Sequence, residues 1–220
     1  MSGSVTPALL EAVQRELSAE GEPVDTLAIN SRGGDLASAI QLGTIVRERG
    51  MTVRVDGLCA GPCAMLLAPA AKRLVVPEGS FLVATPIPSP RGHSAAVEAY
   101  RDAPSSAAAI QLEAMRWGVE YQDAYFAKLD LDPARIYTIV QAIVDMNAAL
   151  AAAGETDTPG LILDKAYLQT CLAIPSVSVP EFDASDSEEF ARISGRPVGF
   201  LVDGTIFYEG AEVIEFRPEC

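Results

Sequence analysis

The amino-acid sequence predicts an α/β fold, and three observations support this prediction. Short apolar runs of strand length alternate with helical patterns across residues 1–86, and a long alanine-rich stretch follows them. Near the other end of the chain, two β-like runs are joined by Asp203-Gly204, which is a strong hairpin signal. Of the 220 residues, 49% are hydrophobic and only 21% are charged, so the chain can bury a large core.

Residues 1–86 supply the first part of the expected α/β core. Thr6 and Pro7 form the N-cap and first turn of a helix that ends near Ala19. Asp35 can cap a second helix with one apolar face, and Gly50 ends it. The elements expected after the first helix are strands at 24–30, 51–55, 73–77 and 80–85, the second helix at 36–49 and a short helix after residue 63.

The character of the sequence changes at about Pro86. Residues 86–94 are expected to form a loop because of their prolines, and residues 94–153 are alanine-rich and mostly helical, with breaks near Pro104 and Pro133. Four aromatic residues recur at helical spacing there and indicate a packing face or an oligomer contact. They are Trp117, Tyr121, Tyr125 and Phe126.

The chain therefore divides into three expected parts. They are an α/β core at 1–86, a helical arm at 87–153 and a C-terminal segment at 154–220 that completes the core, with a hairpin near 197–209. Within the last part, residues 162–173 predict a short helix and the acidic residues 176–189 a surface loop.

The charge of the chain excludes several classes of partner. The formal net charge is −14, from 30 acidic and 16 basic residues, and the densest basic cluster is only Arg47-Glu48-Arg49. Nucleic acid and anionic membrane surfaces are therefore not expected as partners. No apolar run approaches the roughly 20 residues that cross a bilayer, so we expect no membrane insertion. Since His93 is the only histidine, no multi-histidine metal site can form, and no cofactor is expected.

Two short motifs lie where chemistry is most plausible. Gly33 and Gly34 in SRGGD connect a strand to a helix, where they could cradle a phosphate, make a tight turn or donate an N–H to an oxyanion. The second motif is CAGPC at residues 59–63, which lies just where an apolar helical run begins. No side chain between its two cysteines can act as an acid, a base or a nucleophile.

The surrounding sequence resembles the Clp protease proteolytic subunit, and in particular its single-chain periplasmic relatives. The resemblance is carried over residues 2–86 by LAINSRGGDLASAIQLGTIVRERG and then GLCAGPCAMLLAPAAKRLVVPEGSFLVATP. The family's order is strand, Ser-Pro-Gly-Gly, helix, strand, a nucleophilic serine at a helix start, two strands and a histidine. The periplasmic branch has this serine inside Cys-x-Ser-x-Cys. The resemblance implies a ClpP/crotonase-like spiral of ββα units, with an inserted helical arm and a C-terminal β-hairpin.

The catalytic positions of the family are not preserved in this chain. Gly61 lies where the resemblance places the serine, and Pro62, which has no N–H, lies where an oxyanion donor is expected. Ala84 lies where the histidine base is expected, whereas Gly33 and Gly34 of the oxyanion loop remain. Loss of one oxyanion donor lowers a rate about 100- to 1,000-fold, and loss of the base about 100- to 10,000-fold more. His93 is a poor substitute because it is expected in the proline loop.

Cys59 and Cys63 match the flanking cysteines of the periplasmic branch, and a disulfide between them is the favoured interpretation. It would fix the turn that Gly61 and Pro62 now occupy. Two reduced, buried thiols are an alternative, and so is a metal site made with His93, although no fourth ligand is evident. Cys63 could also be a relocated nucleophile with a lowered pKa near a helix N-terminus.

We therefore expect a ClpP-like pseudoprotease that binds or scaffolds other molecules. Its ligand would be a peptide or protein in the former substrate groove, and a homo-oligomer is expected. The competing class is an active serine- or cysteine-type peptidase with a relocated nucleophile, and a third class is acyl-CoA chemistry of the crotonase type. The N-terminus lacks the features of a signal peptide, so the compartment stays open. The cysteine pair and the resemblance favour a periplasmic or exported protein.

Overall fold

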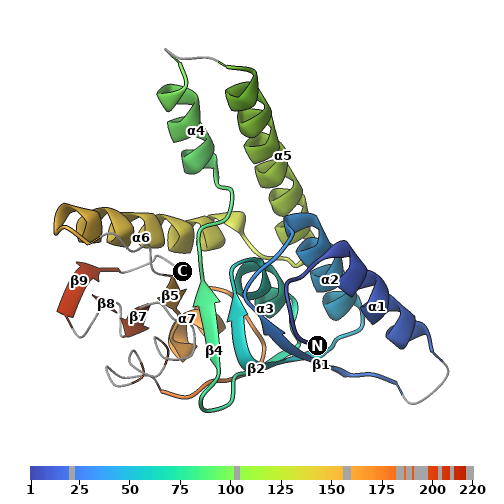
Figure 1. Ribbon diagram of the computed structural model, residues 1–220. Coiled ribbons are helices and arrows are strands. Elements are labelled where there is room, and N and C mark those ends of the chain that lie inside the picture. Colours follow the sequence, from blue (N-terminus) through green and yellow to red (C-terminus); the bar gives the residue numbers. More distant parts are fainter. Residues whose placement is uncertain are drawn as a thin grey trace.

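The computed structural model confirms the α/β class (Figure 1). It describes residues 1–19, 23–101, 105–155, 160–181, 186, 190, 198–202, 205–208 and 211–216. A nine-stranded sheet, mostly parallel and partly antiparallel, forms the body of the molecule together with helices α1–α7 and the short π-helix η1. Within the described residues, no helix is both long enough and apolar enough to span a bilayer.

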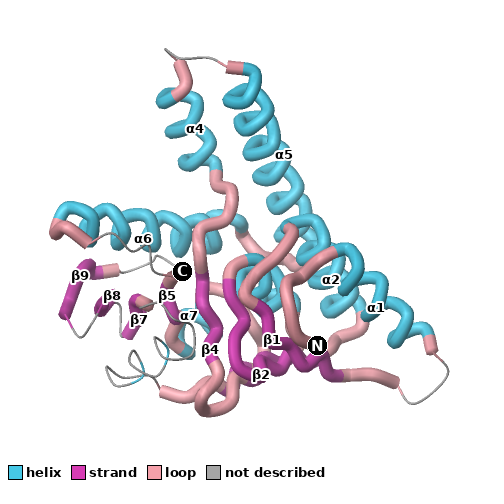
Figure 2. The backbone as a smooth tube through the Cα atoms, in the orientation of Figure 1, coloured by secondary structure: helices cyan, strands magenta, loops and turns pink. Residues whose placement is uncertain are grey.

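Strand β2 (Thr52–Ala60) is the centre of the sheet (Figure 2). It pairs in parallel with β1 (Thr26–Ser31) on one side, and on the other with β3 (Arg73–Val75) and then β4 (Phe81–Ala84). The strand predicted at 51–55 is therefore too short, because β2 continues to Ala60. Gly57, with φ +103°, lets the backbone bulge where β2 changes its partner from β3 to β4.

Two helices and the N-terminal segment complete this part. Helix α1 (Pro7–Ser18) is capped by Thr6, and α2 (Leu36–Glu48) by Asp35, whose Oδ1 accepts from the Ser38 N–H at 2.7 Å. Residues 2–5 lie parallel to β1, through bridges at Ser2–Asn30 and Val5–Gly34. A Cβ at position 34 would lie 2.1 Å from the Val5 carbonyl oxygen, so only glycine fits there.

The C-terminal segment adds strands to the same sheet. Strand β5 (Leu161–Ile162) pairs antiparallel with β4 and parallel with β7 (Gly199–Val202), and β7 forms the predicted hairpin with β8 (Thr205–Tyr208). The Asp203-Gly204 turn itself lies outside the described residues. Three of these strands are not predicted by any pattern in the sequence. They are β5, β6 (Val177–Ser178), which pairs with β3, and β9 (Ala211–Glu215), which pairs with β8.

Part of this segment differs from the prediction. The short helix expected at 162–173 is limited to α7 (Lys165–Thr170), which Asp164 caps, because the preceding apolar residues pair as β5. Much of the acidic stretch at 176–189 lies outside the described residues.

The helical arm consists of α4 (Pro90–Ala99), α5 (Ser106–Lys128) and α6 (Pro133–Ala152). Helices α4 and α5 run side by side and stand away from the sheet, whereas α6 lies beside the core (Figure 1). The loop expected at 86–94 is partly wrong: Ser89 caps α4 and Pro90 occupies its first turn, so His93 is helical. The prolines predicted a loop, but Pro90 lies in the first turn of α4, where proline favours a helix rather than breaking it.

The buried side chain of Tyr125 connects the arm to the core. The Tyr125 hydroxyl in α5 donates to the carbonyl oxygen of Leu66 in η1 (Cys63–Leu67), at 2.7 Å, and the ring is 2% exposed. Helix α2 makes room for it with Gly43, where a Cβ would lie 2.0 Å from the Tyr125 hydroxyl. Burial raises the pKa of this hydroxyl, although the Arg47 charge opposes the shift, so it stays a hydrogen-bond donor at neutral pH.

We predict that Gly43→Ala destabilises the protein by about 1–3 kcal/mol, because the new methyl group displaces Tyr125. Tyr125→Phe should cost about 1–2 kcal/mol, because the Leu66 carbonyl loses its donor inside the core. Gly43→Ala should lower the free energy of unfolding by at least about 0.5 kcal/mol less in the Tyr125→Phe protein than in the unchanged protein, since the hydroxyl is gone. Urea unfolding of the four proteins measures this, and strictly additive losses would contradict the proposed contact.

Candidate functional site

The candidate site is the turn between β2 and η1. Strand β2 ends at Ala60 and η1 begins at Cys63, so Gly61 and Pro62 alone reverse the chain. Gly61 adopts φ +57°, a left-handed conformation in which a side chain is strained. Its N–H donates to the Val83 carbonyl at 3.1 Å, and its carbonyl accepts from the Met65 N–H at 2.8 Å. These two hydrogen bonds thus connect the turn to β4 on one side and to η1 on the other.

A disulfide closes the turn, as predicted. Cys59 and Cys63 are joined covalently, with their Cα atoms 5.4 Å apart, and each is fully buried. Cys63 is therefore neither a free thiolate nucleophile nor a thiolate ligand in this structure. The interpretation of the pair as two reduced thiols is wrong for the same reason, and the alternative metal site with His93 loses both of its sulfur ligands.

The space beside Gly61 is crowded. A Cβ built at this position lies 3.1 Å from Thr85 Oγ1 and 3.9 Å from Gly33 Cα. The first distance is tight, so a serine side chain could enter only if the Thr85 side chain shifted by a few tenths of an ångström. Thr85 follows the last residue of β4, and its contact with position 61 arises only when β4 pairs with β2.

The glycine-rich turn SRGG lies where the sequence analysis placed it. A Cβ at Gly33 would be 3.7 Å from both the Ala60 carbonyl oxygen and Pro62 Cδ, so the two motifs are in contact. However, the Gly33 N–H already donates to Ser31 Oγ at 3.3 Å, and the Ser31 hydroxyl returns a bond to the Gly33 carbonyl at 2.9 Å. The backbone donors at Gly33 and Gly61 are both engaged, and Pro62 has none.

The two candidate base positions do not supply a base. Ala84 ends β4, is fully buried and pairs with Leu161 of β5. His93 lies in α4 on the arm.

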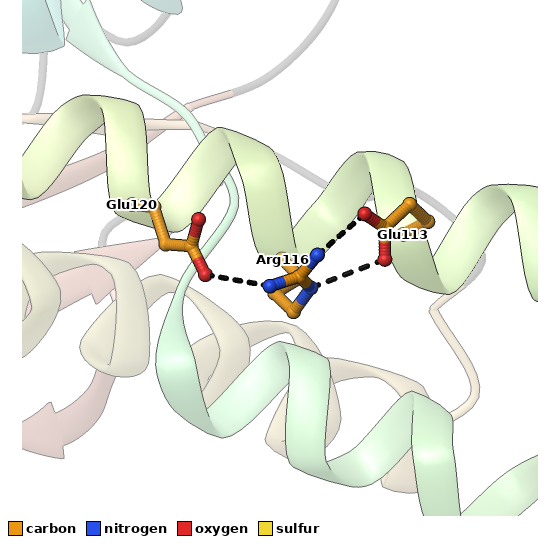
Figure 3. A network of polar contacts seen from close by, with 3 residues as sticks. All are labelled: Glu113, Arg116 and Glu120. Carbon is orange, nitrogen blue, oxygen red and sulfur yellow. Dashed lines mark hydrogen bonds and ion pairs between the residues drawn. The ribbon is translucent and has the colours of Figure 1, made fainter.

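A polar network on α5 contains one of the shifted groups. Arg116 lowers the pKa of Glu113, because it donates to that carboxylate, and it also pairs with Glu120 at 3.0 Å (Figure 3). These three side chains are exposed, so the network stabilises α5 only slightly.

Perturbed ionisable groups commonly mark active sites. In the described part of the chain, the clear pKa shifts concern groups outside the β2–η1 turn. Burial is the main cause of the raised pKa of Tyr125, Tyr137 and Tyr167, and each hydroxyl donates a hydrogen bond. These tyrosines are accounted for by packing rather than by a reaction centre.

No family model matches the chain, and no curated protein matches it at a significant level. Inferences about function therefore rest on the motifs and on the geometry of the turn.

We predict that replacing both Cys59 and Cys63 by alanine lowers the free energy of unfolding by about 2 kcal/mol or more. The bridge closes only a short loop, so chain entropy accounts for about 2 kcal/mol, and the lost sulfur contacts add to it. Urea unfolding of both proteins gives the value.

The bridge itself can be checked chemically. Trypsin releases residues 55–72 as one peptide, and without reduction it should resist iodoacetamide even in denaturant. Alkylation of that peptide in the unreduced protein would show that the thiols are free.

We also predict that Gly61→Ala costs clearly more stability than Gly50→Ala. The two glycines share a φ near +57°, so both variants carry backbone strain of about 1–2 kcal/mol, but the nearest atom to a Cβ at Gly50 is Lys72 Cδ at 3.7 Å. Gly61→Ala adds the contact with Thr85. In the Thr85→Ala background, Gly61→Ala should cost no more stability than Gly50→Ala does. Equal costs of Gly61→Ala and Gly50→Ala in the otherwise unchanged protein would show that Thr85 does not crowd position 61.

Proposed function

We propose that this protein is a ClpP-like pseudoprotease, built on the ClpP/crotonase spiral, that binds or scaffolds peptides or proteins without cutting them. The observation that carries the proposal is the buried Gly61 turn. It has the strand-to-helix geometry that presents a nucleophile, but it has no side chain, and the Thr85 hydroxyl crowds the position that a side chain would take.

The arrangement of the motifs supports the family resemblance. In the family pattern, the glycine-rich turn after the first strand and the nucleophile turn after the second strand belong to one site. Here β1 and β2 are parallel neighbours, and Gly33 lies against Ala60 and Pro62. The two motifs are 25 or more residues apart in sequence, so their meeting supports the alignment of Gly61 with the serine position.

The chemistry of the turn supports loss of catalysis. Acyl transfer through the enzyme needs an attacking atom, and Gly61 offers none. The Gly33 and Gly61 N–H groups are engaged within the protein and Pro62 lacks one, so these three positions offer no donor to an oxyanion. The same shortage counts against acyl-CoA chemistry of the crotonase type, which depends on two backbone donors.

A binding role needs accessible surface near the turn. Gly61 and Gly33 are buried, but Gly34, which follows Gly33, and Pro86, which follows Thr85, are exposed, and Thr85 is partly exposed. An extended peptide could lie along this edge without reaching a reactive group. The disulfide favours an oxidising compartment, such as the periplasm, for this protein.

The arm is the surface that a homo-oligomer would use. Ile110 of α5 is 72% exposed and Trp117 is 50% exposed, although Tyr121 stacks on its ring. By contrast, Tyr125 and Phe126 are buried in the core, so the predicted aromatic face divides between a packing part and an exposed part.

We expect the purified protein to leave casein intact and to form no adduct with a fluorophosphonate or with iodoacetamide at any single residue. Intact-mass spectrometry and gel analysis measure both. Proteolysis that disappears in one single-residue variant, such as Thr85→Ala or His93→Ala, would overturn the proposal. Light scattering on the same sample reports the oligomeric state, and a strict monomer would remove the homo-oligomer from it.

Gly61→Ser serves as the matched variant. It restores the attacking atom but not the base or the oxyanion donor, so it should stay inactive in the same assays. Activity in this variant alone would show that Pro62 and Ala84 are compatible with catalysis.

A further inference from the structure

A second hollow lies at the β2 bulge, apart from the Gly61 turn. It is a cavity of about 320 Å³ lined by residues 2–4, by Asn30 and Arg32 at the end of β1, and by Gly57 and Leu58 of β2. None of Gly61, Pro62, Ala84 and Thr85 is among its lining residues. A test of proteolysis therefore does not bear on it.

The bulge explains why this space exists. Ile29 pairs with Val55, but the next pairing joins Ser31 to Cys59, so three residues of β2 face Asn30 alone. These extra residues interrupt the pairing of the two strands, and the cavity lies at this interruption. The N-terminal segment closes one side of it, because the Gly3 N–H donates to the Asn30 carbonyl and the Asn30 N–H to the Met1 carbonyl, both at 2.9 Å.

The Asn30 side chain is exposed, and only its oxygen bonds to the protein within the described residues. Its Oδ1 accepts from the Leu58 N–H at 3.3 Å, which leaves Nδ2 without an acceptor among the described residues. Gly57 permits this position, since a Cβ there would lie 3.0 Å from Asn30 Nδ2. The amide therefore presents hydrogen-bond donors at the bulge.

Within the part of the chain that the structure describes, Arg32 is the one charged residue in the cavity lining, although the protein carries a net charge of −14. Arg32 is exposed and forms no ion pair with a described residue. No carboxylate lines the cavity, but the hydroxyl-bearing residues Ser2 and Ser4 do. The lining thus combines one free cation with several neutral donors.

We propose that this cavity binds a carboxylate, with the Arg32 guanidinium as its charged partner and the Asn30 amide and serine hydroxyls as additional donors. A singly charged group suits the site better than a phosphate dianion, because the strongly acidic protein repels anions. The volume is at the lower end of the roughly 300–1,000 Å³ of small-molecule sites. It admits a small acid or the last one or two residues of a peptide, whose side chain would lie against Leu58.

The test is an NMR titration of the full ¹⁵N-labelled chain with three probes: N-acetyl-alanyl-alanine, the same dipeptide as its C-terminal amide, and propionate. We expect saturable shifts of the Gly3, Ser4, Gly57 and Leu58 amide signals with the dipeptide acid, and at least about tenfold weaker binding of the amide. Tighter binding of the dipeptide acid than of propionate identifies a peptide C-terminus as the ligand, and equal binding identifies a free acid. Absence of saturable shifts, or equal binding of the acid and its amide, overturns the proposal.

Two arginine variants complete the test. Arg32→Gln should weaken the dipeptide acid about tenfold or more, because the cation is lost. Arg73→Gln removes the same charge from an exposed position on β3 and should leave binding within about twofold. Equal effects of the two variants would show that only net charge matters, and would refute a site at Arg32. The amide spectrum of each variant confirms that it is folded.

Discussion

The architecture depends on how the central strand β2 ends. Three strands pair with β2, and the helix η1 that follows it is buried along its whole length. The two residues between β2 and η1 must therefore turn the chain inside the core. Gly61 meets this constraint with a left-handed conformation, and the disulfide between Cys59 and Cys63 fixes the two ends of the turn to each other. The Leu66 carbonyl of η1 also accepts a hydrogen bond from Tyr125, so one contact between the arm and the core depends on the same turn.

Elements that carry their own local signals could be predicted from the sequence. The capped helix α2 and the β7–β8 hairpin are of this kind, since cap residues and Asp-Gly act over a few residues. Strands β5 and β6 have two residues each, and only their partners define them. The start of α4 was missed for a different reason: Pro90 is compatible both with a loop and with the first turn of a helix, and Ser89 decides between them.

The candidate site could be predicted in part for the same physical reasons. The contact between Gly33 and Pro62 and the disulfide follow from motifs that can be read along the chain. The roles of Ser31 and Thr85 could not be predicted, because each depends on the distance between segments that only the folded sheet brings together. The cavity at Arg32 was missed likewise, since a β-bulge that involves Gly57 leaves no periodic signal.

The Gly61 turn and the bulge of β2 differ in how their hydrogen-bond donors are used. At the turn, the Gly33 and Gly61 N–H groups bond to the protein itself, Pro62 has no N–H, and Thr85 crowds the space beside Gly61. At the bulge the opposite holds, because Asn30 Nδ2 and Arg32 have no partner among the described residues. Donors that face only water can gain a hydrogen bond from a ligand without losing one inside the protein. The bulge is therefore expected to recognise a carboxylate, in addition to any peptide bound along the edge at Gly34 and Pro86.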